Sequence, residues 1–253
     1  MLLAVKSHPR YKLILAANRD EYYERPTAEA TFWEGTPWLL AGRDLRAGGT
    51  WLGITTKGRI AAITNYRDPA SVRDNTPSRG ELVSKFLLGG ESPTDYLEGL
   101  EQKGRDYNGF NLVFGEKQNL YWYSNRGDGG RSLGPGIYGL SNHLLDTPWP
   151  KVTRGKMGMT PLVSGGQEPR PEELFSLLID RHIPDDESLP DTGVGLKWER
   201  VLSPLFIISP HYGTRSSTLI LIDQDDRVTF IERTFDSDPN HPKTVKYQFQ
   251  IEA

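Results

Sequence analysis

Short apolar runs separated by polar turns recur along this chain, and the pattern predicts many short strands. Apolar residues occupy 1–5 and most of 11–17, and the polar connection between them contains Pro9. This arrangement is typical of a β-hairpin, because proline is tolerated where no backbone N–H is needed. Residues 26–37 are expected to be irregular, and the next short strands are predicted over 38–42, 50–55 and 59–66.

Two pairs of helices interrupt the strands. The first pair is predicted over 78–88 and 92–103. Ser78 opens a Ser-x-x-Glu capping box, and Ser92 is followed by a proline suited to a first helical turn. The second pair is predicted over 149–157 and 172–181, where helical patterns return.

The remaining strands are grouped between and after the helix pairs. A polar stretch over 185–195, rich in Asp, Pro and Gly, is expected to be a loop. Strands clustered apart from helices favour an α+β fold over alternating βαβ units, and no linker or repeat divides residues 1–253, so a single domain is predicted. The strands of this group are predicted over 110–114, 119–124, 136–141, 205–209, 218–222, 228–234 and 244–251.

Polar residues recur where the predicted strands end. Asn18, Arg19 and Asp20 follow the apolar run that ends at Ala17. Asparagine is common in turns, because its side chain bonds the local backbone, so each position can be a simple cap. Amide donors together with arginine also suit an oxyanion or a carboxylate ligand. The pattern leaves both interpretations open at these residues and at the similar positions Asn65, Asn142 and Arg215.

Composition narrows the function classes. The chain has 36% hydrophobic and 25% charged residues, which is ordinary for a soluble globular protein. A formal net charge of -3 gives no basic footprint for nucleic acid. No apolar run approaches the ~18 residues of a membrane helix, so no transmembrane segment is predicted. The apolar start at 1–5 is too short for a signal-peptide core, which favours a cytoplasmic location.

Metal and cofactor signatures are missing from the sequence. The chain has no cysteine, and its five histidines are scattered without the i, i+4 spacing of a helical zinc site. Phosphate-loop, dinucleotide and Gly-x-Ser-x-Gly patterns do not occur either. We therefore predict no metal site and no required cofactor.

Motifs along nearly the whole chain resemble those of the NRDE family, also called the transport and Golgi organisation protein 2 family. The most specific is LAANRDEYY at residues 15–23, followed by Arg25 and Pro26. Further blocks match in the same order at residues 40–44, 48–53, 61–66, 78–83, 107–112, 138–142, 147–149, 212–215 and 228–233.

The family in turn resembles the N-terminal-nucleophile hydrolases of the penicillin V acylase and bile-salt hydrolase branch. This resemblance implies a four-layer αββα sandwich with antiparallel sheets. In that branch an N-terminal cysteine, exposed by removal of the initiator methionine, is the nucleophile. Matching the motifs residue by residue, the resemblance implies that the catalytic positions are Arg19, Asp20, Asn65, Asn142 and Arg215.

The N-terminus departs from the family pattern. Family members begin Met-Cys, whereas this sequence begins Met1-Leu2 and offers no Cys, Ser or Thr with a free α-amine. The chain as written lacks the nucleophile of that mechanism, so the sequence leaves open whether it is an enzyme. One hypothesis is that a native Met-Cys start precedes Met1.

Some family members are implicated in haem movement, so the resemblance implies haem as a possible ligand. Without cysteine, an axial ligand would be His, Met or Tyr, and His143 is the candidate beside Asn142. Asn18, Trp51 and Tyr66 are further predicted ligand-binding residues, although the aromatic pair can equally be packing residues. The alternatives are an acyl-amide hydrolase that carries the missing cysteine, and a degenerate non-catalytic interaction protein.

Overall fold

The computed structural model describes residues 1–117, 119–235 and 241–252. Two compact units divide the chain, and each is assembled from separate segments. Unit 1 contains Met1–Glu24, Pro135–Leu140 and Leu145–Phe249, and unit 2 contains Arg25–Gly134, Ser141–Leu144 and Gln250–Ala253. The single domain expected over 1–253 stays a prediction.

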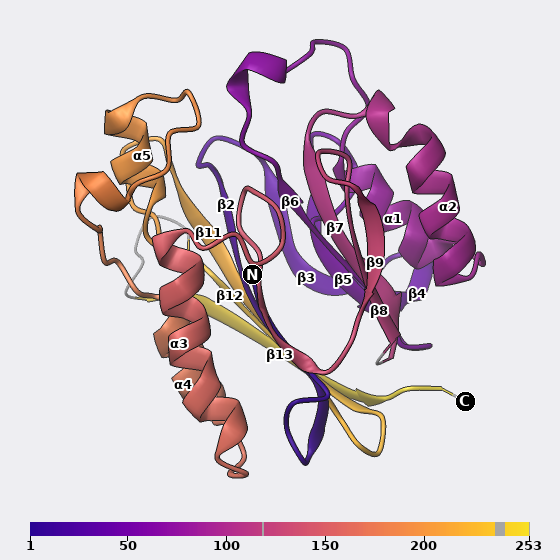
Figure 1. The fold of residues 1–253 in the computed structure, drawn as a ribbon. Coiled ribbons are helices and arrows are strands. Elements are labelled where there is room, and N and C mark those ends of the chain that lie inside the picture. The colour runs from indigo at the N-terminus through magenta and orange to yellow at the C-terminus, as the bar shows by residue number, and fades with distance from the viewer. Residues whose placement is uncertain (118, 236–240, 253) are drawn as a thin grey trace. The chain divides into compact units, whose positions relative to one another are not determined.

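Unit 1 is built on an antiparallel six-stranded sheet (Figure 1). Strands β2 and β11 lie at its centre, and their long pairing dominates the unit. In sheet order the strands are β10 (Gly136–Gly139), β1 (Leu2–Val5), β2 (Tyr11–Tyr22), β11 (Tyr212–Asp223), β12 (Arg227–Thr234) and β13 (Lys243–Gln250).

Helices α3 (Pro150–Ser164) and α4 (Pro171–Leu178) pack against β1, β2, β10 and β11 (Figure 1). Alternate apolar residues of the strands point toward this helix pair, as the two-residue period of a strand requires. Between the helices and the sheet lies a core that includes Ile14, Ala16, Met159, Leu174, Phe175 and Leu219. The short helix α5 (Leu196–Leu202) follows the predicted polar loop.

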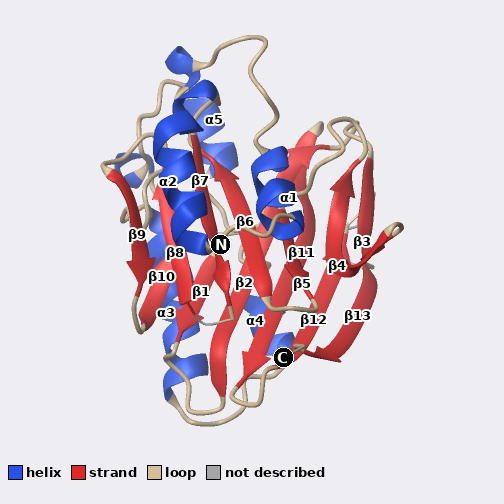
Figure 2. Ribbon diagram, turned by 90° about the vertical axis from the view of Figure 1, so that its right-hand side faces the viewer, coloured by secondary structure: helices blue, strands red, loops and turns tan. Residues whose placement is uncertain are grey.

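Unit 2 contains an antiparallel seven-stranded sheet in which sequence order and spatial order coincide (Figure 2). Helix α1 (Gly80–Leu88) contacts β4 to β7, and helix α2 (Pro93–Lys103) contacts β7 to β9. The strands are β3 (Thr27–Trp33), β4 (Thr36–Asp44), β5 (Leu52–Thr55), β6 (Arg59–Asn65), β7 (Phe110–Glu116), β8 (Asn119–Ser124) and β9 (Gly129–Leu133).

The α+β class is confirmed, because each unit pairs one antiparallel sheet with a helix pair, as each half of an αββα sandwich does. The predicted start of α2 is confirmed as well, since the Ser92 hydroxyl accepts a hydrogen bond from the Asp95 backbone N–H. The capping box predicted at Ser78 is wrong. Arg79 is the N-cap residue of α1, and its side chain makes no capping hydrogen bond.

Two local predictions are overturned by backbone pairing. Residues 26–37 are not irregular, because β3 pairs with β4 through a ladder with register shifts. The strand predicted over 205–209 does not form, apart from an isolated bridge at Ile208. There Phe206 N–H donates to the Asp180 carbonyl and Ile207 N–H donates to the Thr214 hydroxyl, so these groups bond outside any sheet.

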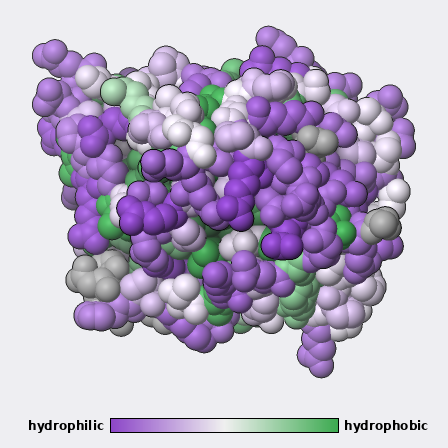
Figure 3. Space-filling model, turned by 90° about the horizontal axis from the view of Figure 1, so that it is seen from below, coloured by the Kyte–Doolittle hydropathy of each residue, from purple (hydrophilic) through white to green (hydrophobic). Residues whose placement is uncertain are grey.

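Hydrophilic residues predominate on the face seen in Figure 3, where hydrophobic side chains form small separate patches. In the part of the chain that the structure describes, no helix is both long and apolar enough to cross a membrane.

We expect the turn after β4 to depend on the ionised carboxylate of Asp44. Burial acts to raise its pKa, but hydrogen bonds from Arg25 and from the backbone N–H groups of Arg46 and Ala47 outweigh burial and lower the pKa. Replacing Asp44 with alanine should cost about 1–2 kcal/mol of unfolding free energy at pH 7. The pKa of Asp44 is lower in the folded protein than in the unfolded chain. The stability difference between the two proteins should therefore be fully present above the unfolded pKa of about 4, and it should be lost as the pH falls through the folded pKa. Urea unfolding of both proteins between pH 7 and pH 3 would measure it, and a constant difference would contradict the assignment.

Candidate functional site

The predicted polar strand end lies inside β2 rather than beyond it, because β11 continues to pair with it. Asn18 pairs with Ser217, and a register shift at Arg215 then brings Asp20 opposite Thr214. A bulge of this kind redirects side chains beside the extra residue. The structure thus collects three of the five predicted catalytic residues, Arg19, Asp20 and Arg215, on two neighbouring strands of unit 1.

The Asn18 side chain has all its main hydrogen bonds within unit 1. Its Nδ2 donates to the carbonyls of Leu178, at 2.9 Å, and Leu205, at 2.8 Å. Its Oδ1 accepts from the Ser217 hydroxyl at 2.6 Å. Both amide hydrogens are therefore engaged in holding the end of α4 and the segment around Leu205 against β2. Ligand binding by Asn18 stays a prediction, whereas this role in positioning is visible.

Asp20 and the Met1 α-amine belong to one electrostatic cluster. The Thr214 hydroxyl donates to Asp20 Oδ1 at 2.7 Å, and the Met1 amine donates to the Leu140 carbonyl at 2.9 Å. Burial lowers the pKa of the Met1 amine to about 5, with a further lowering by the Lys151 ammonium and an opposing effect of Asp20. An amine with this pKa is mostly uncharged at neutral pH and can accept a proton.

Two arginines lie on the same two strands as Asp20 and Thr214. The Arg19 side chain is 8% exposed, and its Nη2 lies 3.9 Å from the Glu21 carboxylate. Arg215 Nη1 donates to the backbone carbonyls of Tyr22 and Tyr23, at 2.9 and 3.1 Å, and so fixes the end of β2. Arg215 therefore ties β11 to the end of β2, and Arg19 contributes a largely buried positive charge beside Glu21.

The other two predicted catalytic residues, Asn65 and Asn142, lie in unit 2. Asn142 Nδ2 donates to the Asn65 carbonyl at 3.0 Å. The Arg67 backbone N–H donates to the Asn142 carbonyl at 2.7 Å, and Arg67 Nη2 donates to Asn142 Oδ1 at 3.3 Å. These bonds attach the segment Ser141–Leu144 to the end of β6.

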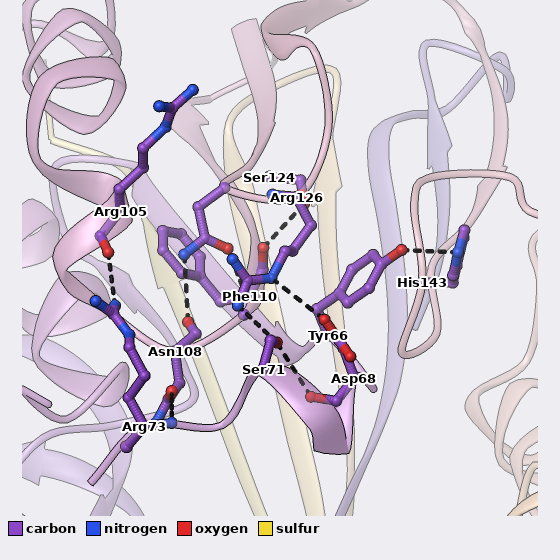
Figure 4. Close-up of polar contacts among 12 residues, drawn as sticks. Tyr66, Asp68, Ser71, Arg73, Arg105, Asn108, Phe110, Ser124, Arg126 and His143 are labelled. Carbon is purple, nitrogen blue, oxygen red and sulfur yellow. Dashed lines mark hydrogen bonds and ion pairs between the residues drawn. The ribbon is translucent and has the colours of Figure 1, made fainter. Parts of the chain in front are cut away.

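This attachment brings Tyr66 and His143 together (Figure 4). Tyr66 Oη lies 2.8 Å from His143 Nε2, and their rings are tilted with centroids 4.9 Å apart. Burial lowers the pKa of His143, and it raises the pKa of Tyr66, where Asp68 adds to the rise and Arg126 opposes it. At neutral pH a protonated phenol can therefore donate to a neutral imidazole.

Two residues that sequence reasoning missed anchor this pair. The Thr64 hydroxyl donates to the Ser141 carbonyl at 2.8 Å, and Asn111 Nδ2 donates to the His143 carbonyl at 3.0 Å. The sequence signal that could have found Asn111 is a polar residue inside the otherwise apolar predicted strand 110–114, since such a residue needs hydrogen-bond partners when buried.

The loop after Tyr66 is held by arginine contacts that Figure 4 shows. Arg126 Nη2 donates to the Ser71 hydroxyl at 2.8 Å, and Arg126 Nε lies 4.0 Å from the Asp68 carboxylate. Further along, the Arg73 N–H donates to Asn108 Oδ1 at 2.9 Å, and Asn108 Nδ2 returns a bond to the Arg73 carbonyl at 3.0 Å. The loop between Asp68 and Arg73 is therefore held by side chains rather than by a sheet.

Trp51 packs on the backbone of β4. A Cβ atom added to Gly42 would lie 2.4 Å from the Trp51 ring, so this close contact requires glycine. The Trp51 carbonyl accepts a hydrogen bond from Ile63 N–H at 2.9 Å, which joins it to β6. Its predicted contact with a ligand stays a prediction.

Across the described residues, no group of three or more His, Asp or Glu side chains is arranged to hold a metal ion.

Comparison with known proteins identifies the family of the chain. Residues 1–237 match the family model described as Transport and Golgi organisation 2. The chain belongs to this family. It is 40% identical to the Transport and Golgi organization protein 2 homolog of Bos taurus, over 96% of this chain and 94% of that protein. The homolog from Homo sapiens is 38% identical over the same shares.

The fold of this Transport and Golgi organisation 2 family member is that of the N-terminal-nucleophile hydrolases. The structure of penicillin V acylase from Agrobacterium tumefaciens matches it with a TM-score of 0.51. The match covers 97% of this chain and 90% of the acylase at 11% sequence identity. At that identity the likeness describes the fold alone, and the resemblance predicted from the sequence motifs is confirmed at this level.

Proposed function

We propose that this protein binds haem through the Tyr66–His143 pair and acts as a carrier rather than as a catalyst. The observation that supports the proposal is the 2.8 Å contact between Tyr66 Oη and His143 Nε2. Histidine and tyrosine are both axial ligands of haem iron in proteins. Because burial lowers the pKa of His143, its imidazole is neutral at pH 7, which is the form that ligates a metal.

The pair offers two modes of ligation that balance chemically. In the first, His143 Nε2 would bind the iron in place of its present contact with the Tyr66 hydroxyl. In the second, Tyr66 binds ferric iron as a phenolate, and its proton moves to His143 Nε2. Thr64 holds the Ser141 carbonyl and Asn111 holds the His143 carbonyl in either mode, so the ligand geometry is preorganised.

A titration with ferric haem tests the proposal. We expect a saturable shift of the Soret band, and replacing His143 with glutamine should weaken binding at least tenfold. Replacing Tyr66 with phenylalanine separates the two modes, because only phenolate ligation requires its oxygen. His182, an exposed histidine of unit 1, provides the matched control when replaced with glutamine. A missing Soret shift, or an affinity unchanged in both variants, would refute haem binding at this pair.

Amide-bond hydrolysis is the second candidate, and the cluster around Met1 and Asp20 supports it. In an N-terminal-nucleophile mechanism, a cysteine thiol gives its proton to its own α-amine before attacking an amide carbonyl. The buried amine with a pKa of about 5 beside Asp20 is an environment in which such an amine stays unprotonated. What the cluster lacks is the thiol.

Extending the chain with Met-Cys supplies that thiol. Acyl-amide hydrolysis should appear in the extended protein, and it should be absent from the chain as written and from a Met-Ala extension. Activity in the Met-Cys form alone would establish a hydrolase. If all three proteins are inactive, and mass spectrometry shows that the added initiator methionine has been removed from the Met-Cys form, the result would argue against hydrolysis.

A further inference from the structure

Several buried polar atoms of the unit 2 sheet have no hydrogen-bond partner among the described residues, and two of them lie on the neighbouring strands β7 and β8. These two are Oδ1 of Asn111 in β7 and Nε1 of Trp122 in β8. Asn111 is 0% exposed and Trp122 is 8% exposed. Burying an unpaired donor or acceptor is unfavourable, so such atoms often mark a place where a bound group completes the hydrogen bonding.

The orientation of the Asn111 amide follows from its neighbours. Its Nδ2 lies 3.0 Å from the His143 carbonyl and 3.3 Å from the Thr64 hydroxyl. A carbonyl can only accept, so the nitrogen must face His143 and the oxygen is left as an acceptor. The indole N–H of Trp122 can only donate. The two unpaired atoms are thus one acceptor and one donor.

Strand register places both side chains on one face of the sheet. Asn111 pairs with Ser124, and Trp122 lies two residues before Ser124 on the same strand. Leu112 and Tyr123, which alternate with them, point into the core under the helices, so Asn111 and Trp122 point the other way. Diagonal positions of this kind are about 7–8 Å apart in an antiparallel pair.

The Trp122 ring extends toward the end of β8. Its outer edge lies 3.6 Å from the position that a Cβ atom on Gly127 would take, just beyond the end of the strand. Leu144 Cδ2 lies 3.1 Å from that same position. The Trp122 ring therefore lies close to the segment that carries His143, whose carbonyl accepts a hydrogen bond from Asn111 Nδ2.

We propose that Asn111 and Trp122 bind a secondary amide group of a ligand. Trp122 Nε1–H donates to the amide carbonyl, and the amide N–H donates to Asn111 Oδ1. The N–H and C=O of a trans amide point in opposite directions, so one group bridges a donor and an acceptor placed on either side of it. A carboxylate lacks a donor and would leave Asn111 Oδ1 facing another acceptor.

This amide site goes beyond both functions proposed above, and its binding depends on neither of them. An ester of the same length keeps the carbonyl and lacks the N–H. The ester should therefore bind at least tenfold more weakly, as sites built around a hydrogen bond reject ligands that cannot complete it.

Titration of the ¹⁵N-labelled chain, followed by NMR, tests the site without any turnover. We expect N-methylhexanamide to shift one indole N–H signal saturably, with methyl hexanoate at least tenfold weaker. Trp122→Phe should remove that signal and weaken amide binding, which is measured by competition. The midpoint of thermal unfolding of this variant checks that it is folded. Trp38→Phe, at a 42% exposed position of β4, is the matched control and should leave the response intact.

Several outcomes would overturn the site. Equal affinities for the amide and the ester, an indole signal unmoved by the amide, or binding unchanged in Trp122→Phe would each do so. If the indole N–H shows a cross-peak to bound water and does not respond to the amide, the partner of Trp122 is a buried water only, and the amide site is refuted. Because binding is read directly, inactivity of the Met-Cys protein would leave this result unaffected.

Discussion

Replacing Asn18 with alanine should lower the free energy of unfolding by about 3–5 kcal/mol. The change removes three hydrogen bonds at once and leaves the Leu178 and Leu205 carbonyls and the Ser217 hydroxyl without their partner. Ser217 is fully buried, so water cannot easily replace the lost bond. Urea unfolding followed by circular dichroism would measure the loss.

The substitution Asn18→Asp tests the reason for that loss. An aspartate side chain has nearly the same shape as asparagine, but its ionised carboxylate would face two carbonyl oxygens, so the loss at pH 7 should be at least as large as for alanine. Asn119, an exposed strand residue, is the matched control, and its replacement by alanine should change stability by no more than about 0.5 kcal/mol. If Asn18→Ala proved as mild as the control, the hydrogen bonds of Asn18 would have no energetic role.

Replacing Phe86 with alanine should destabilise the protein by about 3–5 kcal/mol. Phe86 is 0% exposed, and its ring contacts Tyr96 and Phe114 with centroids 5.1 and 5.2 Å apart. The Arg59 guanidinium also lies over the ring, 4.1 Å from its centroid. Alanine would open a cavity in the core of unit 2 and remove the aromatic face that this buried cation contacts.

A leucine at position 86 separates these two effects. It fills most of the cavity but has no aromatic face, so its cost should lie well below that of alanine. Leu88, on the exposed side of the same helix, is the control, with a change within about 0.5 kcal/mol on replacement by alanine. Thermal and urea unfolding of the three variants would rank them, and equal costs for leucine and alanine would contradict the cavity argument.

Local pattern predicted elements whose signals are local. Ser92 caps α2 because its own hydroxyl reaches Asp95, and the apolar runs become strands because their side chains alternate. Elements that depend on a distant partner could not be predicted from the sequence. The apolar run ending at Ala17 gives no sign that β11 extends pairing to Tyr22, and β3 exists because β4 lies beside it.

The candidate site shows the same division. Motif resemblance named residues that the structure distributes over both units, with Asp20 in unit 1 and Asn142 in unit 2. The contact between Tyr66 and His143 joins positions 77 residues apart, and periodicity carries no information about such pairs. Asn111 could not be predicted for a related reason. Its role is to bond the carbonyl of His143, which is distant in the sequence, so its sequence neighbours give no sign of it.

The pairing of β2 with β11 has a consequence for the protein during synthesis. Asp20 and Thr214 are 194 residues apart in the chain, so β2 leaves the ribosome long before its main neighbour. At typical synthesis rates of about 5–20 residues per second, the interval is roughly 10–40 s. Throughout it, an apolar strand has an open edge of the kind that recruits other strands. We therefore expect this edge to need protection from other strands until β11 emerges.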